Sequence, residues 1–349
     1  MSSRGGSRVT VVVCSLNGEA TLGRTLEALA AQTVADVMDV LVVDDGSTDD
    51  TALVASRHGA RVVQHGDNRG LAAARNTGWR AAGTPLVAFT DDDCRPSPDW
   101  VELMLDGIDR HPTASAVGGA VRGSGDETFM LRYLQRSNPL APLEATLLQD
   151  DGLVHRLALY LRRSASPSVP TGERPVSSIV GASMLFRVDA LDRHEGFDAR
   201  FRFGGEEEDL CRRIVLAGEE LVFLPGAVVE HDFEPGLGDT LRRSRAYGRG
   251  NARMFLKHPG LRPTIYPLPA AVAALLALAV GRRSAPAALL AGALPSVLFS
   301  RWVGDAVRLR EPERLAYPYV QLAQETWGDV GLLQELRRSR GAFREPVAG

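Results

Sequence analysis

The sequence has almost no lysine, few cysteines and no apolar segment at its start. Lys257 is the only lysine among forty basic residues, a bias typical of a GC-rich genome that carries little chemical information. Cys14, Cys94 and Cys211 are far apart and form no CxxC pair, which excludes a disulfide framework and a cysteine-based zinc site. Because the N-terminus lacks the pattern of a signal peptide, we expect at least the first two-thirds of the chain to be cytoplasmic.

Other absences narrow the class of protein. The net charge of −3 gives no general attraction to nucleic acid, so no nucleic-acid partner is expected. The first predicted strand continues into "VVVCSLNGEATL", which contains neither a G-x-G-x-x-G fingerprint nor a P-loop. Dinucleotide binding of the dehydrogenase type therefore lacks its phosphate loop. No repeat of solenoid length is present, and 349 residues suffice for one large α/β domain with an appendage or two modest domains.

The first part of the chain alternates short β-branched apolar runs with segments of helical spacing. Strands are predicted over residues 9–14, 37–43, 61–64, 85–89, 114–121, 178–186, 221–224 and 227–230. Helices are predicted over residues 20–31, 51–58, 70–82, 98–109, 206–217 and 238–257. Residues 124–175 break this alternation and are interpreted as an insertion or flexible lid. Such alternation predicts an α/β fold with a parallel sheet and right-handed crossovers.

Two predicted strands end in clusters of carboxylates. Residues 40–51 read "VLVVDDGSTDDT" and residues 87–94 read "VAFTDDDC". Ligands of open α/β sheets bind at the carboxyl ends of strands, so the two clusters predict one shared site. On a strand, Asp91 and Asp93 would point to the same face and Asp92 away from it. Two such oxygen ligands suit Mg2+ or Mn2+. Taken alone, Asp91 and Asp93 would fit a polar turn equally well, and the second acidic strand end favours a metal site.

Four segments together resemble a known family. "VVVCSLNGEATL", "LVVDDGSTDDT", "NRGLAAARNTGWRAA" and "VAFTDDDC" resemble the successive signatures of family-2 glycosyltransferases with the GT-A fold, over residues 8–121 and more loosely to about 257. The resemblance implies a Rossmann-like, mostly parallel sheet with flanking helices. It also implies Mn2+ or Mg2+, a nucleoside-diphosphate sugar donor and inverting transfer to an acceptor hydroxyl. The "QxxRW" signature of processive synthases is absent, which favours transfer of a single sugar. The segment "YGRGNARMFLKHP" is similar to glycosyltransferases of the mycofactocin pathway.

The resemblance assigns residues to the donor. Asp45 resembles the carboxylate that accepts a hydrogen bond from the donor's base. Ser15 and Asn17 would line the nucleotide pocket. Arg75 would lie near the base or phosphate, with an exposed helix arginine as the alternative.

It also assigns residues to the metal. Asp91 resembles the ribose- or metal-facing member of the DxD motif, and Asp93 resembles the metal ligand. Asp92, between them, is counted with the donor-binding residues. His231, at the end of a predicted strand, is expected to be a third metal ligand, with a purely structural histidine as the alternative.

The segment 203–214, "FGGEEEDLCRRI", resembles the acceptor-side Gly-Glu-Asp-x-Asp-Leu-x-x-Arg motif of the family. The usual aspartate base falls on Glu207, a departure that lengthens the side chain by one methylene, and Glu206 competes for the role. The alternative is structural, because acidic residues in a first turn complement the helix dipole and Asp209–Arg213 has ion-pair spacing.

Two further features carry open alternatives. Gly181 either lets substrate approach the backbone or marks tight packing. Four arginines of the predicted helix 238–257 share one stripe that would hold diphosphate, face anionic lipid headgroups or form a solvated face. They are Arg242, Arg245, Arg249 and Arg253.

The C-terminal region differs in composition from the rest. We predict a glycosyltransferase domain over 1–257 and a helical region over 258–349 with an apolar hairpin at 268–300. Its two apolar stretches are shorter than the roughly 20 residues of a spanning helix. The hairpin is therefore either soluble, or membrane-embedded or interfacial. A hairpin at the membrane would make the protein peripheral to, or anchored on, the cytoplasmic face of a membrane.

Two rival functions remain open. A sugar nucleotidyltransferase would share the fold, but it depends on a glycine-rich loop with a basic residue that "SLNGEATLGR" fits poorly. A non-catalytic, membrane-associated adaptor that binds nucleotide sugars is favoured only by the change to glutamate at Glu207. No residue specifies whether the acceptor is a small molecule, a peptide or lipid-linked.

Overall fold

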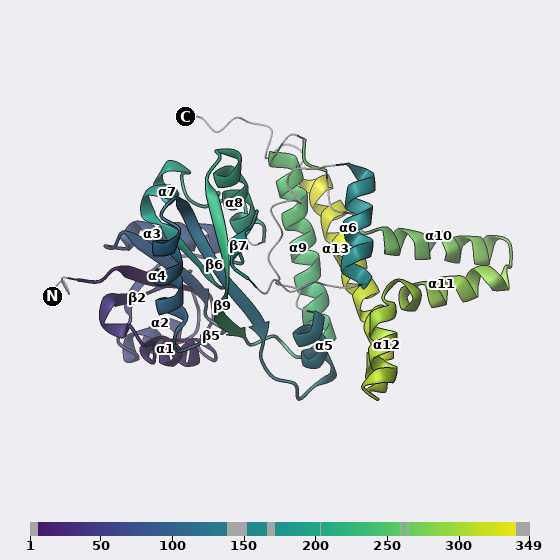
Figure 1. Cartoon of the computed structure of the whole chain (residues 1–349), viewed down its shortest axis with the longest axis horizontal. Coiled ribbons are helices and arrows are strands. Elements are labelled where there is room, and N and C mark those ends of the chain that lie inside the picture. The colour runs from purple at the N-terminus through teal and green to yellow at the C-terminus, as the bar shows by residue number, and fades with distance from the viewer. Residues whose placement is uncertain are drawn as a thin grey trace. The chain divides into compact units, whose positions relative to one another are not determined.

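The computed structural model describes most of the chain, in two compact units (Figure 1). The described residues are 6–137, 152–165, 172–202, 204–258, 260–262 and 265–339. Unit 1 comprises residues 1–126, 134–149 and 170–233, and unit 2 comprises residues 127–133, 150–169 and 234–349.

Unit 1 is built on a nine-stranded sheet with the order β3-β2-β1-β4-β8-β6-β9-β5, in which β7 pairs with β9. Strands β3, β2, β1 and β4 run parallel to one another, and β6 runs parallel to β9. Strand β8 is antiparallel to β4 and β6, and β5 and β7 are antiparallel to β9. The strands are β1 (Val9–Ser15), β2 (Met38–Asp44), β3 (Arg61–Gln64), β4 (Leu86–Asp91), β5 (Cys94–Pro96), β6 (Ala114–Gly123), β7 (Arg174–Pro175), β8 (Met184–Arg187) and β9 (Glu220–His231).

Helices cover both faces of this sheet, which is why its central strands are apolar on both sides. Val11 and Val13 of β1 belong to the core cluster beneath α1, α2 and α4. Val12 and Cys14, which point the opposite way, belong to the cluster beneath α3, α7 and α8. The helices of unit 1 are α1 (Leu22–Ala30), η1 (Ala35–Val37), α2 (Thr51–Arg57), α3 (Leu71–Ala81), α4 (Trp100–Arg110), α7 (Val188–Arg193) and α8 (Glu206–Leu216).

The structure differs from the predicted strands in two regions. The strand expected over 178–186 is reduced to β8, because the chain turns just before it, where the Ser183 N–H donates to the Val180 carbonyl. The strands expected over 221–224 and 227–230 form the single strand β9. Its pairing with β6 shifts register at Pro225 and Gly226, where proline removes a donor and the strand bulges.

Unit 2 is helical. Its elements are α6 (Leu153–Ala165), α9 (Leu237–Lys257), α10 (Pro267–Gly281), α11 (Ala285–Leu298), α12 (Ser300–Arg308), η3 (Pro312–Ala316) and α13 (Tyr317–Arg338), with the first part of α5 (Phe129–Ser137). α9 and α13 pack closely at small residues, since a Cβ on Gly248 or Gly331 would clash with backbone of the other helix. The predicted insertion 124–175 contains α5 and α6, while residues 138–151 and 166–171 lie outside the described residues.

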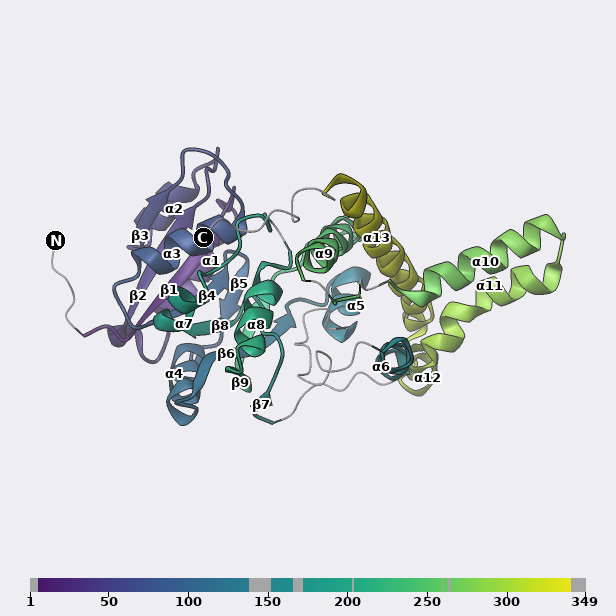
Figure 2. The same cartoon turned by 90° about the horizontal axis from the view of Figure 1, so that it is seen from above.

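The C-terminal apolar stretches fold as α10 and α11, which run side by side (Figure 2). Each helix has a proline in its first turn, where a missing N–H is harmless. Arg283 takes a left-handed conformation at the turn (φ 48°), and the Ser284 side chain accepts a hydrogen bond from the Ala287 N–H at 3.4 Å. Within the described residues, no single helix has the length and apolarity to cross a bilayer. α11 and α12 pass that test only as a pair, with a 70° bend.

Candidate functional site

The two acidic clusters of the sequence lie at the same edge of the sheet. β1 pairs in parallel with β2 on one side and β4 on the other. The register sets Ser15 opposite Asp44 and Cys14 opposite Asp91, so the carboxyl ends of these strands lie together. This is the edge at which open α/β sheets bind their ligands.

Four potential metal ligands meet at the end of β4. One ligand atom from each of Asp91, Asp93, Cys94 and His231 lies within 4.8 Å of the others. The antiparallel pairing of β5 with β9 sets Cys94 opposite His231, which brings the histidine to the aspartates. His231 Nε2 is 3.6 Å from Asp93 Oδ1, and its buried ring stacks on Phe233 with centroids 4.5 Å apart.

The chemistry of this cluster fits Mn2+ or Mg2+. The side chains of Asp91 and Asp93 are 30% and 27% exposed, so both offer oxygens toward solvent, and His231 adds a borderline nitrogen ligand. Burial, with help from Asp91 and Asp93, holds the pKa of the Cys94 thiol well above its usual value. A neutral thiol is a poor ligand for a hard cation, which leaves two carboxylates and one imidazole.

Asp92 points away from this cluster. Ser15 Oγ donates a short hydrogen bond to Asp92 Oδ2; Ser15 is buried and Asp92 is half-buried. A Cβ on Gly18 would clash with both groups, so this glycine lets the loop after β1 close over them. Burial raises the pKa of Asp92 to about 7. The structure thus places Ser15 and Asp92, both predicted to contact the donor, against each other.

Asp45 anchors the loop before α3. Its Oδ1 accepts a hydrogen bond from the Arg69 N–H at 3.0 Å, and its Oδ2 accepts one from the Gly70 N–H at 2.8 Å. His65 Nδ1 lies 2.6 Å from Asp45 Oδ1, while His65 Nε2 lies 2.9 Å from Thr77 Oγ1 on α3. Asp45 therefore holds a buried network in place at the edge predicted to receive the nucleoside.

Asn17 joins the loops that follow β1 and β2. Its backbone is left-handed (φ 55°), its side-chain oxygen accepts a hydrogen bond from the Thr48 N–H at 2.9 Å, and its own N–H donates to Ser47 Oγ at 2.9 Å. Asn17 is exposed at the same edge, as its predicted place in the nucleotide pocket requires.

Arg75 links the metal cluster to α8. Only 2% of Arg75 is exposed, which rules out the exposed helix arginine. Nη1 donates to Glu206 Oε1 at 2.9 Å and Nη2 donates to Asp91 Oδ1 at 3.3 Å. Burial alone would lower the Arg75 pKa, but Glu206 and Asp91 outweigh it and raise the pKa. A Cβ on Gly181 would lie 2.5 Å from Nη2, so this glycine makes room for the guanidinium.

The first turn of α8 holds the carboxylates predicted to act on the acceptor. Gly205 precedes the helix with a φ of 91°. Glu206 is buried and paired with Arg75, and its pKa rises to about 8 through burial and the neighbouring Glu207, against the effect of Arg75. Asp209 accepts hydrogen bonds from Arg213 at 2.8 and 3.0 Å, which confirms that ion pair. Glu207 is half-buried, and its Oε2, like Oε2 of Glu206, has no hydrogen-bond partner.

The arginine stripe predicted on α9 is only partly available for an anion. Arg245 Nε donates to Gln334 at 2.8 Å, and Arg253 Nε donates to Glu335 at 2.9 Å, both on α13. Arg242 is exposed and pairs with Asp239. Of the three alternatives for the stripe, a solvated face does not hold for Arg245 and Arg253, because α13 packs along α9.

Sequence reasoning missed two connections of the site. His65 comes directly after a predicted strand, a position that could have marked it as a partner of Asp45. The ion pair of Arg75 with Glu206 joins residues 131 positions apart, and no spacing rule signals it.

Comparison with known proteins places this geometry in context. The family model for glycosyl transferase family 2 matches residues 10–193. The chain is 30% identical to a pre-mycofactocin glycosyltransferase of Mycobacterium tuberculosis over 306 residues, which is 87% of this chain and 58% of that protein. It is also 30% identical over 223 residues to an N-acetylglucosaminyl-diphospho-decaprenol L-rhamnosyltransferase of the same species, or 60% of this chain and 71% of that one. The chain thus spans under two thirds of the first relative's length.

Among solved structures, the chain resembles a mannosyltransferase of Pyrobaculum calidifontis determined in complex with GDP-Man and Mn2+. The TM-score is 0.63 with 22% sequence identity, covering 94% of this chain and 87% of the other. At this identity the likeness establishes the fold.

Proposed function

The chain belongs to glycosyltransferase family 2 and has the GT-A fold, and from this premise we propose that it moves one sugar from a nucleoside-diphosphate sugar to an acceptor hydroxyl, with inversion and with Mn2+ or Mg2+. One observation carries the proposal. The ligand cluster of Asp91, Asp93 and His231 is joined through Arg75 to the first turn of α8, where Glu207 keeps an unpartnered oxygen.

Asp91, Asp93 and His231 would hold the cation. When bound, it supplies a Lewis acid that balances the negative charge of a departing diphosphate. Support for a metal comes from the fit of the ligand set and from the Mn2+ in the Pyrobaculum mannosyltransferase.

Glu207 would act as the base. The acceptor oxygen attacks the anomeric carbon as the bond from that carbon to the diphosphate oxygen breaks, and the hydroxyl proton passes to the Glu207 carboxylate. A single displacement of this kind inverts the anomeric centre. Glu206 is the weaker candidate, because its buried carboxyl is held by Arg75.

Asp45 and Asn17 would seat the nucleoside at the neighbouring strand ends. Asp45 is fixed by two backbone N–H groups, and Asn17 fixes the adjoining loops, so both stand on a rigid frame. Ser15 and Asp92 would support that frame from beneath rather than touch the donor.

The test compares Glu207→Gln with Glu206→Gln, and Glu208→Gln serves as a control on the same helical turn. We expect Glu207→Gln to keep donor binding in calorimetry with Mn2+ while transfer falls by about a hundredfold or more. Glu208→Gln should retain both. Near-normal turnover in Glu207→Gln would move the base to another residue.

The same assay separates the rival functions. Transfer should release a nucleoside diphosphate, whereas release of pyrophosphate would indicate a nucleotidyltransferase. Donor binding with Mn2+ but no consumption of any donor would favour the adaptor. Screening nucleotide sugars by thermal shift, with and without Mn2+, identifies the donor first, since a specific ligand raises the apparent stability.

We also propose a cytoplasmic location. The three cysteines are free and buried, as is usual in a reducing compartment. Protease added to intact and to lysed cells would test this, because a protein in the cytoplasm or on the cytoplasmic face of a membrane is digested only after lysis. Digestion in intact cells would contradict it.

A further inference from the structure

Helices α10 and α11 are apolar on every side and yet largely exposed. α10 carries no polar side chain, and α11 carries only Ser296. In α10, Leu268 is the one buried residue among those described, while Leu276 is 49% and Val280 is 80% exposed. In α11, Leu289 is 75% exposed. A helix that is apolar all round belongs inside a protein core or inside a membrane.

Exposed apolar residues are concentrated in unit 2. Among the exposed large apolar side chains of the described residues, all but Leu16, Leu53 and Leu216 belong to this unit. Scattered exposed leucines, as in unit 1, are normal for a soluble surface, whereas a gathered set marks an interaction surface.

The distribution of apolar residues around each helix distinguishes a protein partner from lipid. A second copy of the chain, or another protein, would cover one face and leave the opposite face in water, where polar residues would be expected. α10 has no polar face at all, and the hairpin of α10 and α11 extends away from α13 in both views (Figures 1 and 2). Lipid surrounds an inserted helix on all sides and therefore fits this pattern.

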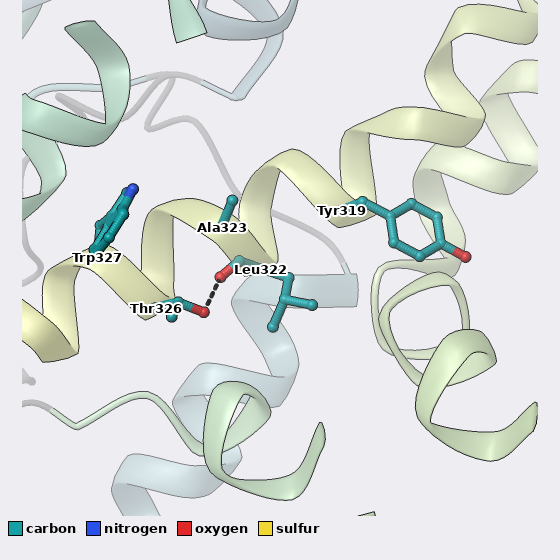
Figure 3. A pocket seen from close by; sticks show the side chains of 5 residues that line it. All are labelled: Tyr319, Leu322, Ala323, Thr326 and Trp327. Carbon is teal, nitrogen blue, oxygen red and sulfur yellow. Dashed lines mark hydrogen bonds between the residues drawn. The ribbon is translucent and has the colours of Figure 1, made fainter. Parts of the chain in front are cut away.

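The base of the hairpin is fixed to α13. Tyr319 on α13 donates to the Gly292 carbonyl at 3.0 Å, and its hydroxyl lies 3.2 Å from Ser296 Oγ. Along the same helix, an open and mostly apolar groove of about 350 Å³ is lined by Tyr319, Leu322, Ala323, Thr326 and Trp327 (Figure 3). The apolar surface of the hairpin thus continues onto α13.

We propose that the hairpin of α10 and α11 inserts upright into a lipid bilayer. The 15 residues of α10 form a helix about 22 Å long. The hydrocarbon core of a bilayer is about 30 Å thick, so the helix reaches past the middle of the core but does not cross it. Arg282 and Arg283 stand at the turn, and their long side chains would reach on toward the far headgroups. A hairpin lying flat would leave half of its apolar surface in water, so the upright arrangement is favoured.

The first test is flotation of the full chain with vesicles of phosphatidylcholine, alone and mixed with phosphatidylglycerol. The variant Leu276→Glu/Leu289→Glu places charges in the hairpin. The control Leu53→Glu/Leu216→Glu changes leucines that are 43% and 67% exposed in unit 1. We expect wild type and control to float on both compositions and the hairpin variant to bind about tenfold or more weakly. Flotation that requires the anionic lipid would point instead to the arginines and overturn insertion.

A second measurement reads depth. The native cysteines are buried, so single changes Leu276→Cys, Val280→Cys and Leu53→Cys give selectively labelled sites for a polarity-sensitive dye. Upright insertion predicts strong quenching by lipids brominated in their chains at residue 276, weaker quenching near the turn at residue 280, and none at residue 53. Equal, shallow quenching at residues 276 and 280, or concentration-dependent dimers with no lipid binding, would refute the proposal. Neither measurement depends on sugar transfer, so its outcome is separate from that of the proposed function.

Discussion

Replacing Arg75 by methionine tests the central link of the site. Methionine keeps an unbranched side chain of similar length but removes the guanidinium that pairs with Glu206 at 2.9 Å and Asp91 at 3.3 Å. Because Arg75 and Glu206 are each only 2% exposed, water cannot replace the lost partner. We therefore expect the free energy of unfolding to fall, by an amount that depends on pH.

The pH dependence follows from the pKa of Glu206. With Arg75 present this pKa is raised to about 8. Below that pH the carboxyl is largely protonated, and the loss should be that of buried hydrogen bonds, about 1–3 kcal/mol. Without Arg75 the pKa of Glu206 must rise further, so above pH 8 the folded variant retains a proton that wild type releases. Above pH 8 the loss of unfolding free energy in Arg75→Met should therefore grow by up to about 1.4 kcal/mol per pH unit. It should approach the 3–5 kcal/mol typical of a broken buried ion pair.

Urea unfolding at pH 6 and pH 9 measures both values, followed by fluorescence of the buried Trp79 and Trp100. Arg80→Met is the matched control, since Arg80 lies on the same helix but is exposed. Because its guanidinium stacks over the Trp79 ring at 4.6 Å, Arg80→Met should lower the free energy of unfolding by up to about 1 kcal/mol, and by the same amount at both pH values. An equal loss of unfolding free energy for Arg75→Met at both pH values would refute this prediction. So would a loss no greater than that of Arg80→Met.

Three further changes test other parts of the structure. Asp93→Asn should weaken Mn2+ binding by about tenfold or more in calorimetry. Its Tm should not change, because Asp93 is part-exposed. An unaltered affinity would show that Asp93 is not a metal ligand. Gly181→Ala should lower the free energy of unfolding in urea by about 1–3 kcal/mol, since its Cβ would lie 2.5 Å from Arg75 Nη2. Gly226→Ala should cost less, because its Cβ would meet only Leu103 Cδ1, at an ordinary contact distance of 3.8 Å. Burial raises the pKa of Glu325 from 4.5 to about 7, so wild-type stability should fall as pH rises through that window. The Tm of Glu325→Gln should not show this fall with pH. The same fall in the variant as in wild type would mean that Glu325 is not its cause.

The parallel core of the sheet was predictable because its strands are continuous β-branched runs covered on both faces. β1, β2 and β4 lie where residues 9–14, 37–43 and 85–89 indicated, to within two residues at each end. The prediction over 178–186 was wrong because apolar composition does not distinguish a strand from a buried turn. Here the turn carries Gly181, whose role depends on a distant arginine.

Local geometry also made the grouping of Asp91 and Asp93 predictable. Alternation along the chain put Asp91 and Asp93 on one side and Asp92 on the other, and this division persists although the strand ends at Asp91 and a turn follows. His231 was indicated by the resemblance to the family. The position of Cys94 opposite His231 was not foreseen, because it depends on the antiparallel register of β5 and β9, which brings two distant segments together.

The charges of the site explain why we propose different roles for the neighbouring residues Glu206 and Glu207. Arg75 is shared by two carboxylates, while Asp93 and Glu207 add negative charge nearby, so the cluster as a whole is acidic. One carboxyl of such a group lowers the repulsion by keeping its proton, and the most buried one does so most readily. That group is Glu206, which leaves the more accessible Glu207 to exchange protons with an acceptor. A glutamate in place of the usual aspartate base is thus compatible with catalysis, provided that Arg75 keeps its neighbour in place.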